Sequence, residues 1–108
     1  MKGFVSALAA AAGLSVASGA FAADPTGGEA LAKNSGCLAC HTVDKKVVGP
    51  AYKDVAAKYR NDKAAEAKLI KKVKAGGKDV WGDVPMPPNT HVKDEDIKII
   101  VQWILSIK

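Results

Sequence analysis

Two cysteines and a histidine stand close together in the first half of the chain, as Cys37-Leu38-Ala39-Cys40-His41. Cysteines three residues apart lie on one side of a helical turn, with a rise of roughly 4.5 Å between them. Two thiols placed in this way can form thioether bonds with the vinyl groups of one porphyrin, and His41 follows as a nitrogen ligand for its iron. The spacing is the c-type haem attachment signature, and it predicts one covalently bound haem c.

Three other kinds of site use the same Cys-x-x-Cys spacing: a structural disulfide, a thioredoxin-like redox pair and half of a zinc site. Zinc would need two further ligands, which only His41, His91 and carboxylates could supply. A thioredoxin-like pair should follow a strand and open a helix, whereas the residues before Cys37 have a helical pattern. Haem attachment is therefore the leading interpretation, and the disulfide and the redox pair are its alternatives.

Met86 is the leading candidate for the second axial ligand of the iron. It stands in the segment Val84-Pro85-Met86-Pro87-Pro88-Asn89, where prolines restrict the backbone and lower the entropic cost of holding a thioether in place. A soft sulfur ligand suits iron that alternates between Fe(II) and Fe(III). Two alternatives are that Met86 only fills the core, and that His91 is the ligand instead of being an exposed residue before the last helix.

The first 22 residues have the pattern of a secretory signal peptide. Met1-Lys2 is followed by an apolar run over residues 4–16, and Ala20-Phe21-Ala22 supplies the small-residue pattern of a cleavage site. We expect cleavage after Ala22, with cleavage after Ala20 as the alternative. An uncleaved membrane anchor is a further alternative, although the apolar run is short for a span that needs roughly 20 residues.

The mature chain, residues 23–108, is then one small domain exported to the periplasm. Removal of residues 1–22 from the 108 leaves 86, and the net charge falls from +5 to +4 with the loss of Lys2. An oxidising compartment is where c-type haem is attached and where disulfides persist. The lysines are spread along the chain without an arginine-rich aromatic stripe, so we expect neither nucleic-acid binding nor stable membrane insertion after cleavage.

The mature chain has few large side chains with which to build a core. Its aromatic residues after Phe21 are Tyr52, Tyr59, Trp81 and Trp103. A domain near this size buries only about 60 to 65% of its unfolded surface. A large, planar, apolar cofactor would supply the missing core, so we expect the haem-free chain to be largely unfolded or molten.

The first half of the mature chain predicts two helices. Thr26 and Glu29 have the spacing of a capping box, which starts a helix that leads into the cysteine motif. Pro50 then begins a second helix over residues 51–59, with apolar residues at i, i+3, i+4 and i+7.

The second half predicts two more helices around a long loop. A helix over residues 63–75 is capped by Asn61 or Asp62, carries lysines on a solvated face, and ends at Gly76-Gly77. The loop that follows, residues 78–91, holds three prolines and is long enough to be functional. The last helix, over residues 93–107, has an acidic start and a broad apolar face that should pack against the first helix.

With these features, the chain resembles the small bacterial class I cytochromes c of the cytochrome c-551 type, also called cytochrome c8. The resemblance covers nearly the whole mature chain. It is carried by Gly36-Cys37-Leu38-Ala39-Cys40-His41, by the segment from Val48-Gly49-Pro50 to Lys58, by Val80-Trp81-Gly82, and by Pro85-Met86-Pro87-Pro88-Asn89. It implies an all-α cytochrome c fold, in which about four helices surround one covalently attached haem, and a protein that carries single electrons in the periplasm.

The resemblance also implies roles for three residues around the haem. The carbonyl oxygen of Pro50 accepts the proton on the non-ligating nitrogen of His41, which fixes the ring. The side-chain amide of Asn89 approaches the sulfur of Met86. The indole N–H of Trp81 reaches a haem propionate, with a plain core aromatic as the alternative role of this residue.

Two positions depart from the family pattern. Where members often have an arginine near a propionate, this chain has Lys72, which cannot form a bidentate pair. One extra residue lies between Asn89 and the last helix, around Thr90 and His91.

The leading functional interpretation is a monomeric electron carrier that is not an enzyme, because two protein ligands leave no open position on the iron for oxygen or peroxide. A haem enzyme or gas sensor with an open iron site is one alternative, and a haem-free secreted module held together by a disulfide between Cys37 and Cys40 is another.

We expect brief docking with redox proteins through a small interface. The resemblance implies a quinol-oxidising complex as donor and a nitrite reductase or terminal oxidase as acceptor. Candidate rim residues for docking are Lys33, Lys45, Lys46, Lys53 and Lys78.

Overall fold

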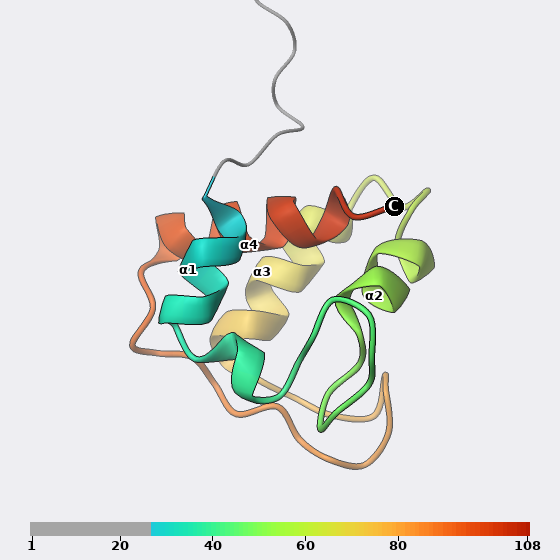
Figure 1. Ribbon diagram of the computed structural model, residues 1–108, viewed down its shortest axis with the longest axis horizontal. Coiled ribbons are helices and arrows are strands. Elements are labelled where there is room, and N and C mark those ends of the chain that lie inside the picture. Colours follow the sequence, from blue (N-terminus) through green and yellow to red (C-terminus); the bar gives the residue numbers. More distant parts are fainter. Residues whose placement is uncertain (1–26) are drawn as a thin grey trace, which may run out of the picture.

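The computed structural model describes residues 27–108, in which four short helices form the framework (Figure 1). The helices are α1 (Gly28–Asn34), α2 (Tyr52–Lys58), α3 (Ala65–Ala75) and α4 (Asp94–Leu105), and a 3-10 turn, η2 (Cys37–Ala39), lies between the first two. Over this range no strand forms, and only two isolated bridges occur. The all-α prediction is therefore confirmed, while the signal peptide and its cleavage sites lie outside the described residues. Within 27–108, no helix has the length and apolar character needed to span a membrane.

The last helix, α4, lies at the centre of the fold. It has its most extensive contacts with α1 and α3, and it also packs against α2. Its buried residues recur at three- and four-residue spacing, which places them on one face of the helix: Ile97, Ile100, Val101 and Ile104. The predicted pairing of the first and last helices is confirmed.

The crossing of α1 and α4 depends on a glycine. A Cβ added to Gly28 would overlap with the Cβ of Trp103 and lie 3.1 Å from the carbonyl oxygen of Ile99. The two backbones can therefore approach each other only where α1 has no side chain. The cap position of α1 is Gly27, in the left-handed conformation at φ 91° and without a side-chain cap, which corrects the predicted cap. The other partner of the predicted capping box, Thr26, lies outside the described residues.

The second helix begins one residue later than predicted. Ala51 is the N-cap, with extended backbone, and its carbonyl oxygen accepts hydrogen bonds from the N–H groups of Asp54 and Val55. Pro50 therefore precedes the helix instead of opening it. Because its carbonyl is not used inside the helix, it is free to accept a hydrogen bond from elsewhere.

The third helix also begins later than predicted, at Ala65. Asp62 accepts a hydrogen bond from the N–H of Ala64 at 2.8 Å and pairs with Lys68, so it closes the turn before the helix instead of capping it. The helix ends at Gly76, whose φ of 75° is a left-handed conformation that favours glycine. The predicted end of this helix is confirmed.

Candidate haem site

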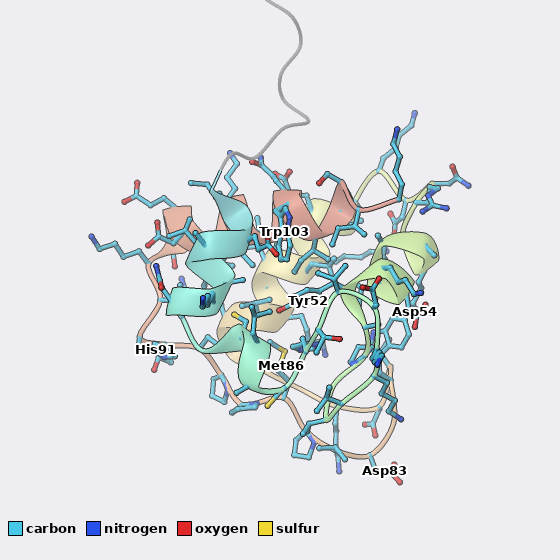
Figure 2. The ribbon with its side chains drawn as sticks, viewed as in Figure 1. Tyr52, Asp54, Asp83, Met86, His91 and Trp103 are labelled. Carbon is cyan, nitrogen blue, oxygen red and sulfur yellow. The ribbon has the colours of Figure 1, made fainter. Side chains whose placement is uncertain are left out.

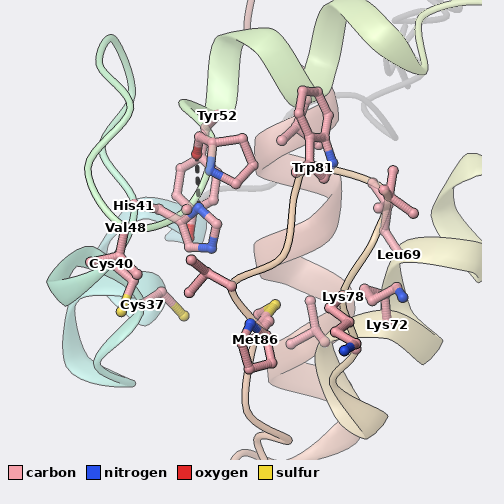
Figure 3. A pocket seen from close by; sticks show the side chains of 18 of the residues that line it. Cys37, Cys40, His41, Val48, Tyr52, Leu69, Lys72, Lys78, Trp81 and Met86 are labelled. Carbon is pink, nitrogen blue, oxygen red and sulfur yellow. Dashed lines mark hydrogen bonds between the residues drawn. The ribbon is translucent and has the colours of Figure 1, made fainter.

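A cavity of about 520 Å³ lies between the cysteine motif, α2, α3, α4 and the loop over residues 77–87 (Figure 3). This volume is typical of sites that hold a small molecule or cofactor. Much of its wall is provided by core side chains from α2 and α4: Tyr52, Val55, Ile100, Val101 and Ile104. A large apolar group would therefore be an integral part of this core.

Most of the site residues predicted from the sequence meet at this cavity. Its lining includes Cys37, Cys40, His41, Pro50, Trp81 and Met86, which come from segments far apart in the chain. Asn89 and His91 are not part of the lining. The structure thus brings the cysteine motif and the methionine loop, residues 84–89, to one place.

The two cysteines lie on a tight turn that faces the cavity. Gly36 precedes the turn at φ 85°, and the N–H groups of Cys40 and His41 both donate to the carbonyl oxygen of Cys37. Both thiols are free and half-buried. Both residues line the cavity, so both thiols would be available for thioether bonds to a porphyrin held there.

The electrostatics of Cys37 disfavour a redox-active thiol pair. Burial raises the pKa of its thiol, an effect that the neighbouring Tyr52 hydroxyl only partly offsets. Thioredoxin-like cysteines need a lowered pKa, because the thiolate is the reactive form. Across residues 27–108, no group of three or more His, Cys, Asp or Glu side chains is arranged to hold a metal ion.

His41 is held by three contacts. Its Nδ1 donates to the carbonyl oxygen of Pro50 at 2.8 Å, the contact that the resemblance implies. Its ring stacks on Tyr52, with centroids 4.8 Å apart and planes 17° from parallel. A Cβ on Gly49 would overlap with Cε1 of the ring and lie 2.8 Å from Nδ1. Because Nδ1 carries the proton, Nε2 retains the lone pair that a metal ligand needs.

Replacement of Gly49 by alanine should displace the imidazole. The added methyl group has no free space, and His41 is only 9% exposed, so the ring must tilt and lengthen its hydrogen bond to Pro50. We expect Gly49→Ala to alter the haem absorption spectrum and to destabilise the protein by about 1–3 kcal/mol, as for other overpacked sites. Thermal unfolding and absorption spectra would measure both effects. Gly27→Ala is the control for the spectrum, because that position has open space, although its φ of 91° adds a backbone strain that Gly49→Ala lacks; equal spectra for the two variants would contradict the prediction.

Tyr52 has a larger role than the sequence indicates. The pattern predicts only a member of an apolar stripe, whereas the structure stacks this ring on His41 and sets it edge-on to Trp103, with centroids 5.5 Å apart. Burial is the main cause that raises the pKa of the Tyr52 hydroxyl well above its ordinary value, with a further contribution from Cys37. The hydroxyl therefore stays neutral next to the site. In the sequence, this role could have been inferred from the aromatic residue that directly follows Gly49-Pro50-Ala51.

The methionine loop is attached to the end of α3. Met86 and Gly77 form an isolated antiparallel bridge, in which the N–H of Met86 donates to Gly77 at 2.8 Å and the N–H of Gly77 donates to Met86 at 3.0 Å. The side chain of Met86 is half-buried and lines the cavity (Figure 3). Its backbone is thus held independently of its sulfur.

Asn89 makes two contacts that the sequence did not predict. Its side-chain Nδ2 donates to the carbonyl oxygens of Val73 at 3.0 Å and Pro87 at 3.2 Å. The approach of this amide to the sulfur of Met86 stays a prediction. The contact with Val73 forms because its carbonyl lies in the last turn of α3, where no further helical N–H is available to it.

Trp81 stands at the mouth of the cavity and is 40% exposed, so it is not a plain core aromatic. The ammonium group of Lys58 lies 5.7 Å from the centre of its ring, a cation–π distance. Lys72, which stands where family members often have an arginine near a propionate, lines the cavity and packs against the backbone of Gly77. The helical pattern of the sequence did not predict that Lys58 and Lys72 would lie near Trp81 and the cavity.

His91 is exposed and turned towards α1. Its Nε2 lies 3.2 Å from the carbonyl oxygen of Ser35, a residue 56 positions earlier in the chain. Figure 2 shows it apart from Met86. The geometry therefore favours Met86 over His91 as the residue that reaches the cavity.

Comparison with known proteins agrees with this arrangement. A family model described as Cytochrome c matches residues 26–108. The chain is 61% identical over 77 residues to cytochrome c-551 of Allochromatium vinosum, a match that covers 71% of this chain and 82% of that protein. It is 51% identical over 98 residues to cytochrome c-551 of Pseudomonas aeruginosa, covering 91% and 90% of the two chains.

Solved structures show the same likeness. Wild-type cytochrome c552 of Nitrosomonas europaea superposes with a TM-score of 0.72 at 51% identity, over 74% of this chain and 99% of that one. The cavity with its two sulfur donors and its imidazole fits the covalent haem of such proteins. The chain therefore belongs to the cytochrome c family, as a small class I cytochrome of the c-551 type with one covalently bound haem c.

Proposed function

We propose that this protein carries single electrons in the periplasm, with Cys37 and Cys40 as the points of haem attachment and His41 and Met86 as the axial ligands. One observation carries the ligand assignment: His41, whose Nδ1 donates to Pro50 and so leaves Nε2 as the nitrogen for a metal, and Met86 both line the cavity that the cysteine motif borders. The transfer of electrons itself follows from the family.

The haem supplies the redox chemistry, because its iron gains and loses one electron. The chain provides the surroundings for that change. The carbonyl oxygen of Pro50 holds the Nδ1 proton of His41 and so fixes the ligand's orientation. The apolar walls from α2 and α4 exclude water, and two protein ligands leave no open position for a substrate. This is the arrangement of a carrier and not of an enzyme.

The proposal also includes export of the protein to the periplasm. The basic start, the apolar run and the Ala20-Phe21-Ala22 pattern support removal of residues 1–22, which leaves residues 23–108 as the mature periplasmic protein. Mass spectrometry of the exported protein tests this directly. The expected mass is that of residues 23–108 plus one haem, whereas retention of residues 1–22 would contradict the cleavage.

An absorption spectrum of the mature protein, oxidised and reduced, tests the ligand assignment. We expect sharp c-type bands in the reduced form and a weak red sulfur-to-iron band in the oxidised form. Haem bands without the sulfur band would contradict ligation by Met86. Rapid binding of carbon monoxide to the reduced protein would indicate an open iron site and an enzyme or sensor.

The docking surface that we propose borders the cavity. Five apolar residues on the two loops beside it are between 40% and 64% exposed, and we call them the apolar rim: Val47, Val48, Val80, Trp81 and Val84. Two lysines, Lys46 and Lys78, are exposed beside this rim and also line the cavity. Such a surface suits brief docking with acidic redox proteins, with a quinol-oxidising complex as donor and a nitrite reductase or terminal oxidase as acceptor.

Reversal of the two rim charges should slow electron transfer to an anionic oxidant. We expect Lys46→Glu with Lys78→Glu to reduce the rate of oxidation by ferricyanide about three- to tenfold at low salt, because charges near the docking site steer association. The difference should shrink as salt screens the charges. The control is Lys98→Glu with Lys108→Glu, which makes the same change in net charge at exposed sites outside the cavity. Equal rates for both double variants would rule out steering at the rim.

A further inference from the structure

The tip of the loop over residues 77–87 is a tight turn that presents Trp81. The N–H of Asp79 donates to the carbonyl oxygen of Gly82 at 2.8 Å, and both residues have a left-handed backbone, with φ of 82° and 122°. This hydrogen bond lies within the turn, so it fixes the shape of the tip but not its position over the cavity. Trp81 lines the cavity and is still 40% exposed. Its position therefore depends on a contact with another part of the fold.

Such a contact comes from the end of α2. The ammonium nitrogen of Lys58, in the last turn of this helix, lies 5.7 Å from the centre of the Trp81 ring and 5.8 Å from the centre of the Tyr59 ring. Tyr59 is the C-cap of α2, is half-buried and also lines the cavity. Figure 3 shows the indole of Trp81 next to this helix. One ammonium group is thus shared by a ring at the end of α2 and a ring at the tip of the loop, and we call this arrangement the ammonium bridge.

The charges around Lys58 favour this arrangement. The face of an aromatic ring carries partial negative charge and attracts a cation that lies within about 6 Å of its centre. The last turn of a helix also favours a cation, because its carbonyl groups carry partial negative charge. Neither of the ion pairs within residues 27–108 includes Lys58, so no carboxylate neutralises its charge there. At an exposed site, a cation–π contact shifts an equilibrium by about two- to fivefold.

We infer that Lys58 is a positioning residue, whose ammonium group holds Trp81 against the end of α2 and so keeps the tip of the loop at the mouth of the cavity. The bridge uses the face of the indole ring, which leaves the N–H at the ring edge free for the contact with a haem propionate that the resemblance implies. The consequence for electron exchange rests on the proposed function, because Trp81 belongs to the apolar rim. The ammonium bridge itself does not.

NMR spectra of the haem-bearing protein in the reduced form test the bridge. In the wild type, the methylene protons next to the Lys58 ammonium should be shifted upfield by the two rings and should show nuclear Overhauser effects to Trp81. In Lys58→Gln, which removes the charge, the indole N–H of Trp81 should exchange with solvent about two- to fivefold faster, because the ring leaves the mouth more often. The indole N–H of Trp103, whose ring lies against Tyr52, should keep its rate. An unchanged rate at Trp81 would overturn the inference.

Two further variants separate the bridge from a general loss of charge. Lys58→Arg keeps the cation, and a guanidinium group also stacks on aromatic rings, so the rate at Trp81 should return to that of the wild type. Lys98→Gln makes the same chemical change at an exposed position on α4 outside the cavity and should leave Trp81 unchanged. Equal rates in Lys58→Gln and Lys58→Arg, or an equal acceleration in Lys98→Gln, would contradict the inference.

Oxidation of the reduced protein by two complexes of opposite charge, ferricyanide and tris(phenanthroline)cobalt(III), provides a second readout. Loss of the Lys58 charge alone would slow the reaction with the anion and accelerate the reaction with the cation. Loss of the bridge should accelerate both reactions relative to Lys98→Gln, by up to about fivefold, because the mouth of the cavity is uncovered more often. Opposite changes with the two oxidants would overturn the positioning role and leave only steering. If Lys58→Gln acts on Trp81 as expected but the oxidised wild type lacks the sulfur-to-iron band, the ammonium bridge stands and the proposed ligand is wrong.

Discussion

A mature chain made without haem is expected to lose its cooperative fold. The cavity of about 520 Å³ would be empty or filled with water in such a chain. At about 24 cal/mol per Å³ of cavity, this volume corresponds to about 12 kcal/mol, an upper limit because the cavity opens to solvent. Domains in general have a stability of only about 5–15 kcal/mol.

Because of where the cavity lies, the absence of haem should destabilise the whole fold and not only the residues around the cavity. Ile100, Val101 and Ile104 line it from α4, the helix against which α1, α2 and α3 all pack. Tyr52 and Val55 line it from α2. Without haem, the core faces of two helices would meet water, so the helices that depend on α4 would separate from it or collapse into the space.

Circular dichroism during heating measures the outcome. Residues 23–108 would be produced in a host that does not attach haem, and the same residues exported from a host that does would serve as the control. We expect a sharp transition for the haem protein and a shallow, non-cooperative change for the haem-free chain. A sharp transition in the haem-free chain would show that the helices form a sufficient core alone.

Replacement of Met86 by alanine is expected to lower the reduction potential markedly while haem stays attached. A thioether ligand favours Fe(II), and its loss leaves water or a harder ligand that favours Fe(III). Axial ligands control a range of roughly 0.8 V, so a fall on the order of 0.1 V or more is expected. The loop should remain in place, because the hydrogen bonds of Met86 to Gly77 use only its backbone.

Spectroelectrochemical titration measures the potential, and the red sulfur-to-iron band reports the ligand in the same sample. Val84→Ala is the matched control, since this residue lies in the same loop but is 64% exposed. It should leave both the potential and the band nearly unchanged. An unaltered potential in Met86→Ala would show that another group binds the iron.

The residues that attach the haem could be identified from the sequence because their chemistry is local. Cys37, Cys40 and His41 lie within one turn, so their spacing alone places them together. The same is true of the glycine that ends α3, because a left-handed residue at a helix end depends on few neighbours. Helical periodicity also predicted that the first and last helices pair, since each has only one apolar face to bury.

The tertiary structure alone decided how the ligands are held. Gly49 and Tyr52 confine the ring of His41 through packing between a turn and a helix, which no spacing rule describes. Asn89 bonds to Val73, 16 positions earlier, because the end of α3 leaves a carbonyl without a partner next to the loop. Which partner a side chain contacts depends on which groups lie near it in the folded chain, so these contacts follow from how the helices pack. The sequence by itself determined which groups are proposed to meet the haem, and the packing of distant segments determined what positions them.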